Sequence, residues 1–354
     1  MFSVVHLDLS LHFRGGQRQV FLLHKGLLDE KKQSFLVTNK EGELYQFCKE
    51  QNIQNVIGVK INKNTLAILK RVFLLPKLQS ILKEIKPTHI HFHEPDSLIY
   101  SLFFEKKYIL FETRRVSKPI KNSSIKIKYK RADYHVGVSD SIKNYLESKG
   151  LQNVYHIPSS IDLDLFKNVA KQNVLKNKKS KNVLYIGAFS QMKGVDVLLK
   201  AIPQTINQFP DFHLHMVGTG ELLEEYKSII KELNITDYVT FYGAVTNTQI
   251  FYKEADVVVI PSRRGEGSNG IIKEALASGK TLITSDLQEN LEMIEDGKNG
   301  IIYKNEDSED LADKLVLVLN EKIVFSEELL KKSVEKYDYK NMVISYIKLY
   351  ELDV

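Results

Sequence analysis

Short apolar runs alternate with helical patterns along the whole chain, and this alternation constrains the fold more than any other feature. The runs have the length of buried strands, and helical segments separate nearly all of them. Such alternation is typical of α/β proteins with parallel sheets. The expected strands span residues 2–7, 34–37, 56–59, 89–92, 108–111, 134–138, 154–157, 182–186, 213–217, 239–242, 257–260, 281–284 and 300–303.

A lysine-rich stretch at 166–181 interrupts the alternation and divides the chain. It contains six lysines, no acidic residue and no apolar periodicity, so we interpret it as a linker. A length of 354 residues also indicates about two domains. We therefore expect one doubly wound, Rossmann-like domain at 1–165 and a second at 182–336. The spacing at 337–354 predicts a helix that packs back toward the first domain. Two facing domains of this kind would form a ligand-binding cleft at the carboxyl ends of their strands.

Charge is distributed unevenly between the two halves. Residues 1–165 contain 26 Lys and Arg against 16 Asp and Glu, whereas residues 182–354 contain 18 against 28. The segment 118–131 alone has six cations in fourteen residues. A basic face of this kind is typical of proteins that meet an anionic membrane, an anionic acceptor or nucleic acid. A solvated lysine-rich surface is the alternative interpretation.

The sequence also bears on the compartment. The N-terminal residues have no basic region before their apolar residues, so they do not read as a signal peptide. No apolar run reaches the roughly 18 residues that a spanning helix needs. Cys48 is the single cysteine, which fits a reducing environment and excludes a disulfide within the chain. We expect a cytoplasmic protein that is at most peripheral on the inner face of the cytoplasmic membrane.

The stretch 261–279, PSRRGEGSNGIIKEALASG, carries the strongest chemical signal. An apolar strand runs into a glycine-rich loop, and a helix opens near Asn269. The free N–H groups of Ser268, Asn269 and Gly270 can bind anionic oxygens. Glu266 and Glu274, eight positions apart, can accept hydrogen bonds from sugar hydroxyls. The pattern predicts a site for a phosphorylated, polyhydroxylated ligand; the alternative is an ordinary loop with two solvated acids.

Three further glycine turns follow expected strands. The first contains Gly16, where the absence of a side chain would allow close approach to a phosphate. The second contains Gly187 and Lys193, and the lysine could reach a diphosphate as a point charge. The third, with Gly218 and Gly220, resembles half of a dinucleotide fingerprint but lacks the third glycine, so it is weak evidence for NAD. Each could also be a simple turn.

Polar residues gather on two neighbouring strands of the first half. Alternation along a strand places His89, His91 and His93 on one face. They could be core histidines, substrate contacts in the cleft, or metal ligands. The next strand ends in Arg114 and Arg115, which suit phosphate or carboxylate recognition, although a solvated basic turn would look the same.

Taken in order, these motifs resemble the retaining glycosyltransferases of family 4, which have the GT-B architecture. The resemblance covers almost the whole chain, and its most specific part is the pair of glutamates with seven residues between them. The other matching segments are RGGQRQ at 14–19, the strand of His91 and His93, TRRV at 113–116, VGVSDSIKNYL at 136–146, IPSSID at 157–162, YIGAFSQMKGVDVLL at 185–199 and VGTG at 217–220.

The resemblance implies a set of donor-binding residues. Glu274 would hold the ribose hydroxyls of a nucleotide-diphosphate sugar, and Val245 would contact the base through its main chain. The remaining donor residues would bind the diphosphate or line the glycine turns around it. They are Gly16, Gly187, Lys193, Gly218, Gly220 and the backbone N–H groups of Ser268, Asn269 and Gly270.

The resemblance also implies the catalytic and acceptor-side residues. Glu266 would contact the transferred sugar, His93 would face the sugar and the acceptor, and Lys193 would stabilise the leaving diphosphate. His91, Arg114 and Arg115 would lie on the acceptor side. The family is metal-independent, so no metal site and no cofactor beyond the donor are expected.

One departure from the family pattern concerns the diphosphate. Family members commonly carry Arg directly after the glycine that Gly187 matches, whereas this chain has Ala188. Lys193 alone, or Arg14, Arg114 or Arg115, would then have to compensate.

The resemblance predicts a retaining hexosyltransferase of cell-envelope glycan synthesis, with a lipopolysaccharide, capsule or lipid-linked acceptor and no nucleic-acid partner. The alternatives are a GT-B nucleotide-sugar epimerase, a catalytically weak binding subunit of a glycan-assembly complex, and a Rossmann oxidoreductase.

Overall fold

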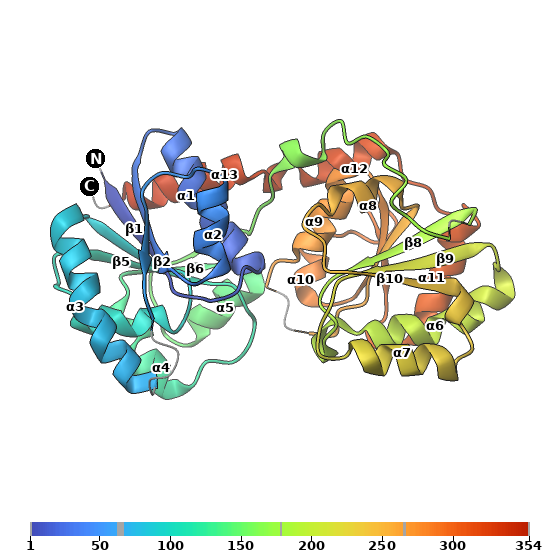
Figure 1. Ribbon diagram of the computed structural model, residues 1–354, viewed down its shortest axis with the longest axis horizontal. Coiled ribbons are helices and arrows are strands. Elements are labelled where there is room, and N and C mark those ends of the chain that lie inside the picture. Colours follow the sequence, from blue (N-terminus) through green and yellow to red (C-terminus); the bar gives the residue numbers. More distant parts are fainter. Residues whose placement is uncertain (1, 62–66, 178, 265–266, 353–354) are drawn as a thin grey trace. The chain divides into compact units, whose positions relative to one another are not determined.

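The computed structural model describes residues 2–61, 67–177, 179–264 and 267–352, and these form two compact units (Figure 1). Unit 1 consists of Met1–Ile161 and Tyr339–Val354, and unit 2 of Asp162–Asp338. Each unit has a parallel sheet with helices on both of its faces, as Figure 1 shows. Every expected strand coincides with an observed one, which confirms the α/β prediction. The boundaries agree to within two residues except for the strand expected at 108–111, which runs from Ile109 to Arg114.

Unit 1 has a seven-stranded sheet in the order β3-β2-β1-β4-β5-β6-β7. Its strands are β1 (Ser3–Asp8), β2 (Gln33–Asn39), β3 (Val56–Val59), β4 (His89–Phe92), β5 (Ile109–Arg114), β6 (Tyr134–Gly137) and β7 (Val154–His156). Its helices are α1 (Gly15–Asp29), α2 (Glu43–Glu50), α3 (Ala67–Ile85), α4 (Asn122–Ile127), α5 (Asp140–Ser148) and α13 (Tyr339–Tyr350), with the 3-10 turns η1 (Ser97–Phe103) and η2 (Tyr129–Arg131).

The central strand β1 is buried at all six residues because helices cover both faces of the sheet. Val5 and Leu7 pack into the core on one face, and Val4 packs into the core on the other. This alternation follows from the two-residue period of a strand.

The C-terminal helix α13 packs against α1 within unit 1. The two helices approach closely at Gly26, where an added Cβ would lie 2.3 Å from Cγ2 of Val343. The backbone N–H of Tyr339 also donates to the carbonyl oxygen of Ile161. These contacts fix the aromatic side chains of α13 over the strands β4 and β5.

Unit 2 has a six-stranded sheet in the order β10-β9-β8-β11-β12-β13. Its strands are β8 (Lys181–Ile186), β9 (Phe212–Val217), β10 (Val239–Gly243), β11 (Val257–Ile260), β12 (Thr281–Ser285) and β13 (Ile301–Tyr303). Its helices are α6 (Val195–Gln208), α7 (Leu223–Glu232), α8 (Gln249–Glu254), α9 (Gly270–Ala277), α10 (Gln288–Leu291), α11 (Ser308–Leu319) and α12 (Glu327–Val334), with the 3-10 turns η3 (Leu163–Phe166), η4 (Gln191–Lys193), η5 (Thr236–Tyr238) and η6 (Glu335–Tyr337).

The segment expected to be a linker is held against unit 2 along much of its length. The backbone N–H groups of Gln172 and Val174 donate to the buried carboxylate of Glu254, and that of Lys176 donates to the hydroxyl of Tyr242. Leu175 between them is buried. The backbone of residues 172–176 is therefore part of the packing of unit 2.

Both sheets reverse their strand order at one point, between β1 and β4 in unit 1 and between β8 and β11 in unit 2. The carboxyl end of the sheet at such a switch point is where doubly wound folds bind ligands. The loops that follow these four strands are therefore the candidate ligand-binding elements. Among the described residues, no helix is long and apolar enough to cross a bilayer.

Candidate functional site

Three loops meet at the carboxyl end of the unit 2 sheet, and glycines allow them to touch. The turn after β9 packs on the turn after β8, so that a Cβ on Gly218 would lie 1.9 Å from the carbonyl oxygen of Gly187. A Cβ on Gly220 would likewise lie 2.3 Å from the carbonyl oxygen of Phe189. Two backbone hydrogen bonds, from Gly187 to Val217 and from Phe189 to Thr219, hold the turns together. The predicted glycine residues are therefore neighbours in space.

The turn after β8 also packs on the loop after β11. Gly194 has a φ of +61°, and a Cβ there would lie 2.0 Å from the carbonyl oxygen of Pro261. The N–H of Arg263 donates to the carbonyl oxygen of Met192 at 2.9 Å. The Arg263 guanidinium is in an ion pair with Asp196 in the first turn of α6, with 2.5 Å between Nη2 and Oδ2. Lys193, half-buried in η4, is thus held next to the loop that leads into α9.

Helix α9 begins as predicted from the sequence, with Asn269 as its N-cap. The Asn269 side-chain oxygen accepts from the N–H of Ile271, and the residue is 2 % exposed. Among the described residues, none accepts a hydrogen bond from the N–H groups of Ser268 and Asn269 or from Nδ2 of Asn269. This helix start therefore offers several donors, and the helix dipole adds positive potential there.

The two predicted glutamates stand differently in the structure. Glu274, in the second turn of α9, is half-buried and accepts a 3.0 Å hydrogen bond from the hydroxyl of Tyr252. Tyr252 is fully buried in α8 and packs edge-on against Phe166. Glu266 lies outside the described residues, so its predicted role stays a prediction.

Val245 lies two residues after the end of β10, where the carbonyl oxygen of Gly243 accepts from the N–H of Gly218.

The loop after β11 also includes Arg264, which the sequence analysis passed over. Its side chain is exposed, and its guanidinium is 3.5 Å from Oε1 of Gln191. Ala188, which stands where the family commonly has Arg, accepts at its carbonyl oxygen from the hydroxyl of Tyr185. The described part of unit 2 therefore brings Lys193 and Arg264 to neighbouring loops.

At the carboxyl end of the unit 1 sheet the central feature is a group of three buried histidines. His6 on β1 is directly opposite His91 on β4, and a nitrogen of each ring lies within 4.8 Å of a nitrogen of His93. Nδ1 of His6 is 2.9 Å from Nε2 of His93. His89 was expected on the same face as His91 and His93, but its ring packs on Phe111 and hydrogen-bonds the Thr88 hydroxyl instead. The partner it missed, His6, is on a neighbouring strand.

Hydrogen bonds determine which nitrogen carries the proton in this group. The Arg115 guanidinium donates to Nδ1 of His93 at 3.0 Å, and also to the His93 carbonyl oxygen. Burial, together with the neighbouring His and Arg charges, holds the pKa of His93 and of His6 well below the ordinary value of 6.5. A neutral His93 that accepts at Nδ1 must donate from Nε2, so His6 accepts at Nδ1.

Two residues predicted on the acceptor side are hydrogen-bonded within unit 1. His91 is fully buried, and its ring nitrogens bond the hydroxyls of Tyr350 and Thr113. Arg114 is 5 % exposed, and its guanidinium donates to the Tyr129 hydroxyl and the Lys118 carbonyl oxygen. Both side chains therefore have hydrogen-bond partners inside unit 1, and their predicted acceptor-side role stays a prediction. His93, 5 % exposed with both ring nitrogens bonded, positions Arg115 rather than presenting a free imidazole.

Arg115 is the predicted cation of unit 1 that lies beside the first glycine turn. An ideal Cβ on Gly16 would lie 3.6 Å from Cδ of Arg115, and Arg115 is half-buried. Two carboxyl groups share this edge of the sheet. Asp8 accepts from the Gln17 amide, and Glu94 accepts from the N–H of Leu9. Burial, with the nearby Asp8 charge second, raises the pKa of Glu94 to about 7.

The geometry of the three histidines would allow a metal ion only if existing bonds were broken. A ligand histidine must offer a nitrogen lone pair. Both nitrogens of His91 and of His93 already have hydrogen-bond partners, and a guanidinium donates into the group. Among the described residues, this arrangement therefore fits a hydrogen-bonded cluster better than a metal centre.

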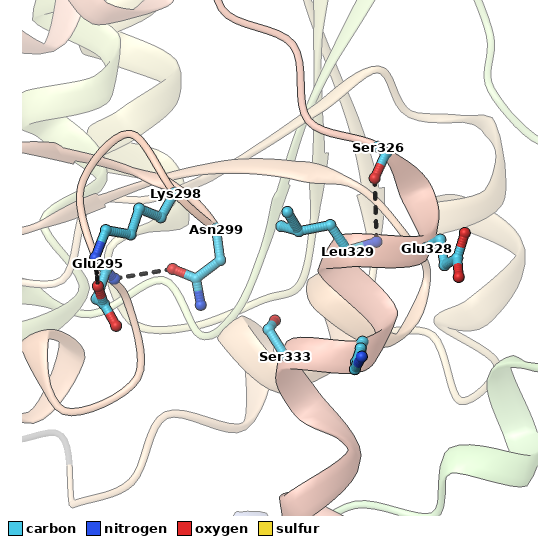
Figure 2. Close-up of a pocket in the computed structure, with 8 residues that line it drawn as sticks. Glu295, Lys298, Asn299, Ser326, Glu328, Leu329 and Ser333 are labelled. Carbon is cyan, nitrogen blue, oxygen red and sulfur yellow. Dashed lines mark hydrogen bonds and ion pairs between the residues drawn. The ribbon is translucent and has the colours of Figure 1, made fainter.

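A separate hollow of unit 2, shown in Figure 2, is lined by residues of α12 and of the turn before β13. Leu329, Ser333 and Lys332 come from the helix, and Glu295, Lys298 and Asn299 from the turn. Glu327, the first residue of α12, packs on Gly279, which lies two residues before β12 begins. The hollow therefore lies at the amino end of the sheet, opposite the converging loops.

Comparison with known proteins agrees with this geometry. The family described as "Glycosyl transferases group 1" matches residues 166–343. An uncharacterized glycosyltransferase of Haemophilus influenzae is 27% identical over 169 residues, which are 48% of this chain and 48% of that protein. The match thus spans about half the length of that relative. A phosphatidyl-myo-inositol mannosyltransferase of Mycobacterium tuberculosis is 24% identical over 280 residues, which are 74% of this chain and 73% of that protein.

Solved structures with the same fold include a glycosyltransferase from Rickettsia africae, with a TM-score of 0.82 and 18% identity. The alignment covers 99% of this chain and 98% of that one. HepE from Anabaena, solved in complex with UDP-glucose, has a TM-score of 0.83 and 16% identity, and 99% of each chain is covered. These similarities establish the GT-B fold. Because the family covers half of the chain and the fold extends over nearly all of it, this protein belongs to the group 1 glycosyl transferases.

Proposed function

We propose that the converging loops of unit 2 bind a nucleotide-diphosphate sugar, and that the enzyme transfers its sugar, a hexose, with retention of configuration. The observation that supports this most directly is the contact of the two glycine turns after β8 and β9 with each other and with the loop that leads into α9, at the switch point of the sheet. This arrangement brings Lys193 and a helix start to one place, together with N–H groups that have no acceptor among the described residues. Solved relatives of the same fold bind UDP and UDP-glucose.

Charge development during transfer explains these groups. When the anomeric C–O bond breaks, positive charge develops on the sugar and negative charge on the departing diphosphate. Lys193 and the N–H groups at the start of α9 stabilise that negative charge where it develops. The acceptor hydroxyl attacks on the face that the diphosphate leaves, and a phosphate oxygen takes its proton. No metal ion is required, and the predicted task of Glu266 is to hold the sugar.

Glu274 has the task of binding the ribose hydroxyls. Its carboxylate is fixed by the buried Tyr252 hydroxyl, so it is already oriented before ligand binds. A hydrogen bond to a charged group contributes roughly 1.5–3 kcal/mol, which corresponds to at least a tenfold change in affinity. We expect Glu274→Ala to weaken binding of a nucleoside diphosphate by that factor and to reduce transfer accordingly.

Isothermal titration with UDP, GDP and ADP measures this effect and identifies the base. Glu232→Ala, in an exposed position of α7, is the matched control and should bind like the wild type. Equal affinities of the wild type and Glu274→Ala would remove Glu274 from the donor site. Consumption of donor without acceptor would instead favour an epimerase, and binding without turnover would favour a binding subunit.

For the acceptor we propose an anionic or lipid-linked glycan at a membrane surface. The described helix α4 and its flanks present exposed Lys118, Lys121, Lys126 and Lys130, and Ile127 between them is 54% exposed. The mycobacterial relative is named for a phosphatidyl-myo-inositol acceptor, which is a lipid. This combination supports peripheral binding to anionic lipid on the inner face of the cytoplasmic membrane, in synthesis of lipopolysaccharide or a related envelope glycan.

Each lysine near an anionic membrane surface contributes about 1 kcal/mol to the free energy of membrane binding. Replacing Lys126, Lys128 and Lys130 by Ser should therefore reduce co-sedimentation with phosphatidylserine vesicles roughly a hundredfold. A variant with Lys227, Lys231 and Lys322 changed to Ser loses the same charge in unit 2 and should sediment like the wild type. Equal sedimentation of all three proteins would argue against this surface.

A further inference from the structure

A lysine in the middle of α9 is fully buried, although it lies one position before Glu274. Lys273 has 0% exposure. Its Nζ is 2.5 Å from Oγ of Ser268, in the loop that precedes the helix. The same ammonium lies over the ring of Tyr337 in η6, 4.8 Å from the centroid. A charge is costly to bury, so its placement directly behind the donor loop calls for an explanation.

The hydrogen bond between Lys273 and Ser268 has only one possible direction. An ammonium group can donate but cannot accept, so the Ser268 oxygen accepts. The hydroxyl hydrogen of Ser268 must then point away from Lys273 and is committed to donating elsewhere. Because the oxygen already faces a cation, the O–H is also polarised and becomes a better donor to an anion.

The surroundings of Ser268 show what such a donor would meet. Among the described residues nothing accepts from the N–H groups of Ser268 and Asn269. Asn269 is 2 % exposed, and its Nδ2 likewise has no acceptor in the part of the chain that the structure describes. Several donors without acceptors, on one loop and backed by a buried cation, match the chemistry of a phosphate group.

We propose that Lys273 is a positioning residue of the donor site, which turns the Ser268 hydroxyl into a dedicated hydrogen-bond donor to the diphosphate. This inference rests on the proposed function, and it adds a side-chain contact to the backbone contacts already assigned to Ser268. The Tyr337 ring, 4.8 Å from the ammonium, adds a cation–π contact that holds Lys273 in place. The contribution of Lys273 therefore passes through Ser268 rather than through contact with the ligand.

The test is a mutant cycle read out by titration with UDP, GDP and ADP, using whichever the wild type binds, and with the matching nucleoside. Ser268→Ala should weaken diphosphate binding about tenfold and leave nucleoside binding unchanged. Ser268→Thr keeps the hydroxyl and should restore affinity to within about threefold. Lys273→Met should lower diphosphate affinity by a similar factor. The double variant, with both Ser268→Ala and Lys273→Met, should bind the diphosphate no more weakly than the weaker-binding of the two single variants.

A matched control uses Lys280, a half-buried lysine just after the end of α9. Lys280 follows the carboxyl end of the helix, donates to the carbonyl oxygen of Lys253, and has a pKa lowered by burial. Lys280→Met should leave the affinity ratio of diphosphate to nucleoside unchanged even if it melts earlier. This separates a general loss of stability from the specific effect.

Three outcomes overturn the inference. Unchanged diphosphate affinity in Ser268→Ala would exclude the hydroxyl contact, and this variant keeps Lys273, so it remains informative if Lys273→Met does not fold. Multiplying losses in the double variant would show that Lys273 acts independently of Ser268. Failure of the wild type to bind any of the three diphosphates would refute the proposed function, and the inference would fall with it.

Discussion

Replacing Gly194 by alanine tests the contact that joins the two principal loops of unit 2. Gly194 has a φ of +61°, and a residue with a side chain costs about 1–2 kcal/mol in that conformation. Its Cβ would lie 2.0 Å from a backbone oxygen of Pro261, which no side-chain rotation can relieve. The loops would have to separate by about 1.4 Å to bring this distance to an ordinary contact of 3.4 Å. That movement would break the 2.9 Å hydrogen bond from Arg263 to Met192, worth about 1 kcal/mol.

These contributions predict a loss of about 2–3 kcal/mol in the free energy of unfolding. For a unit of this size the melting temperature should fall by roughly 4–12 °C in scanning calorimetry. Nucleoside diphosphate binding should weaken as well, because Lys193 directly precedes the glycine. Gly297→Ala is the control, since Gly297 also has a positive φ, +72°, but a Cβ there meets no atom within 4 Å. If Gly194→Ala has the same melting temperature and the same nucleoside diphosphate affinity as Gly297→Ala, the loops are not held together by this contact.

The other predictions concern buried polar groups. Burial lowers the pKa of His24 from 6.5 to about 4. Between these pH values the unfolded chain binds more protons than the folded one, so the folded state loses stability as the pH falls. His24→Gln should remove about 3 kcal/mol of this loss in the free energy of unfolding, as measured by urea unfolding at pH 4.5 and 7.5. Burial raises the pKa of Glu94 from 4.5 to about 7, so the folded state of the wild type loses stability as the pH rises. Glu94→Gln should therefore become more stable relative to the wild type as the pH rises through 7. Parallel curves of unfolding free energy against pH for the two proteins would contradict the shift. Tyr252→Phe keeps the ring but removes the hydrogen bond to Glu274. In titration it should lose nucleoside diphosphate affinity, but less than Glu274→Ala does. An affinity equal to that of the wild type would mean that other contacts fix Glu274.

The parts of the fold that local sequence determines were predictable. Apolar runs of strand length appear as strands because a parallel sheet covered on both faces needs continuous burial, as β1 shows. The start of α9 was predictable for a similar reason, since an Asn cap acts within two residues of itself. The glycine turns were also visible, although the sequence could not show that Gly218 lies against Gly187, because the two turns belong to different strands.

The role of a polar residue at a strand end could not be predicted, because it depends on distant partners. His91 was expected at the acceptor but bonds Tyr350, which is 259 residues away on α13. Arg114 was expected to bind an anion but is buried against Tyr129. Lys273 carried no sequence prediction, and its burial depends on contacts such as that with Tyr337, which is 64 residues away in the chain. In each case the residue type was readable and its burial was not.

The histidines of unit 1 also limit what that unit can contribute to transfer. Because Arg115 donates to Nδ1 of His93, the imidazole is neutral and its remaining proton is engaged with His6. His93 could transfer a proton only after giving up one of these bonds, and burial opposes its protonation. The cluster therefore supplies a fixed cation, Arg115, beside Gly16, and the group near this edge that titrates close to neutrality is Glu94. This division fits a transfer in which a phosphate oxygen takes the acceptor proton and the protein supplies positive charge.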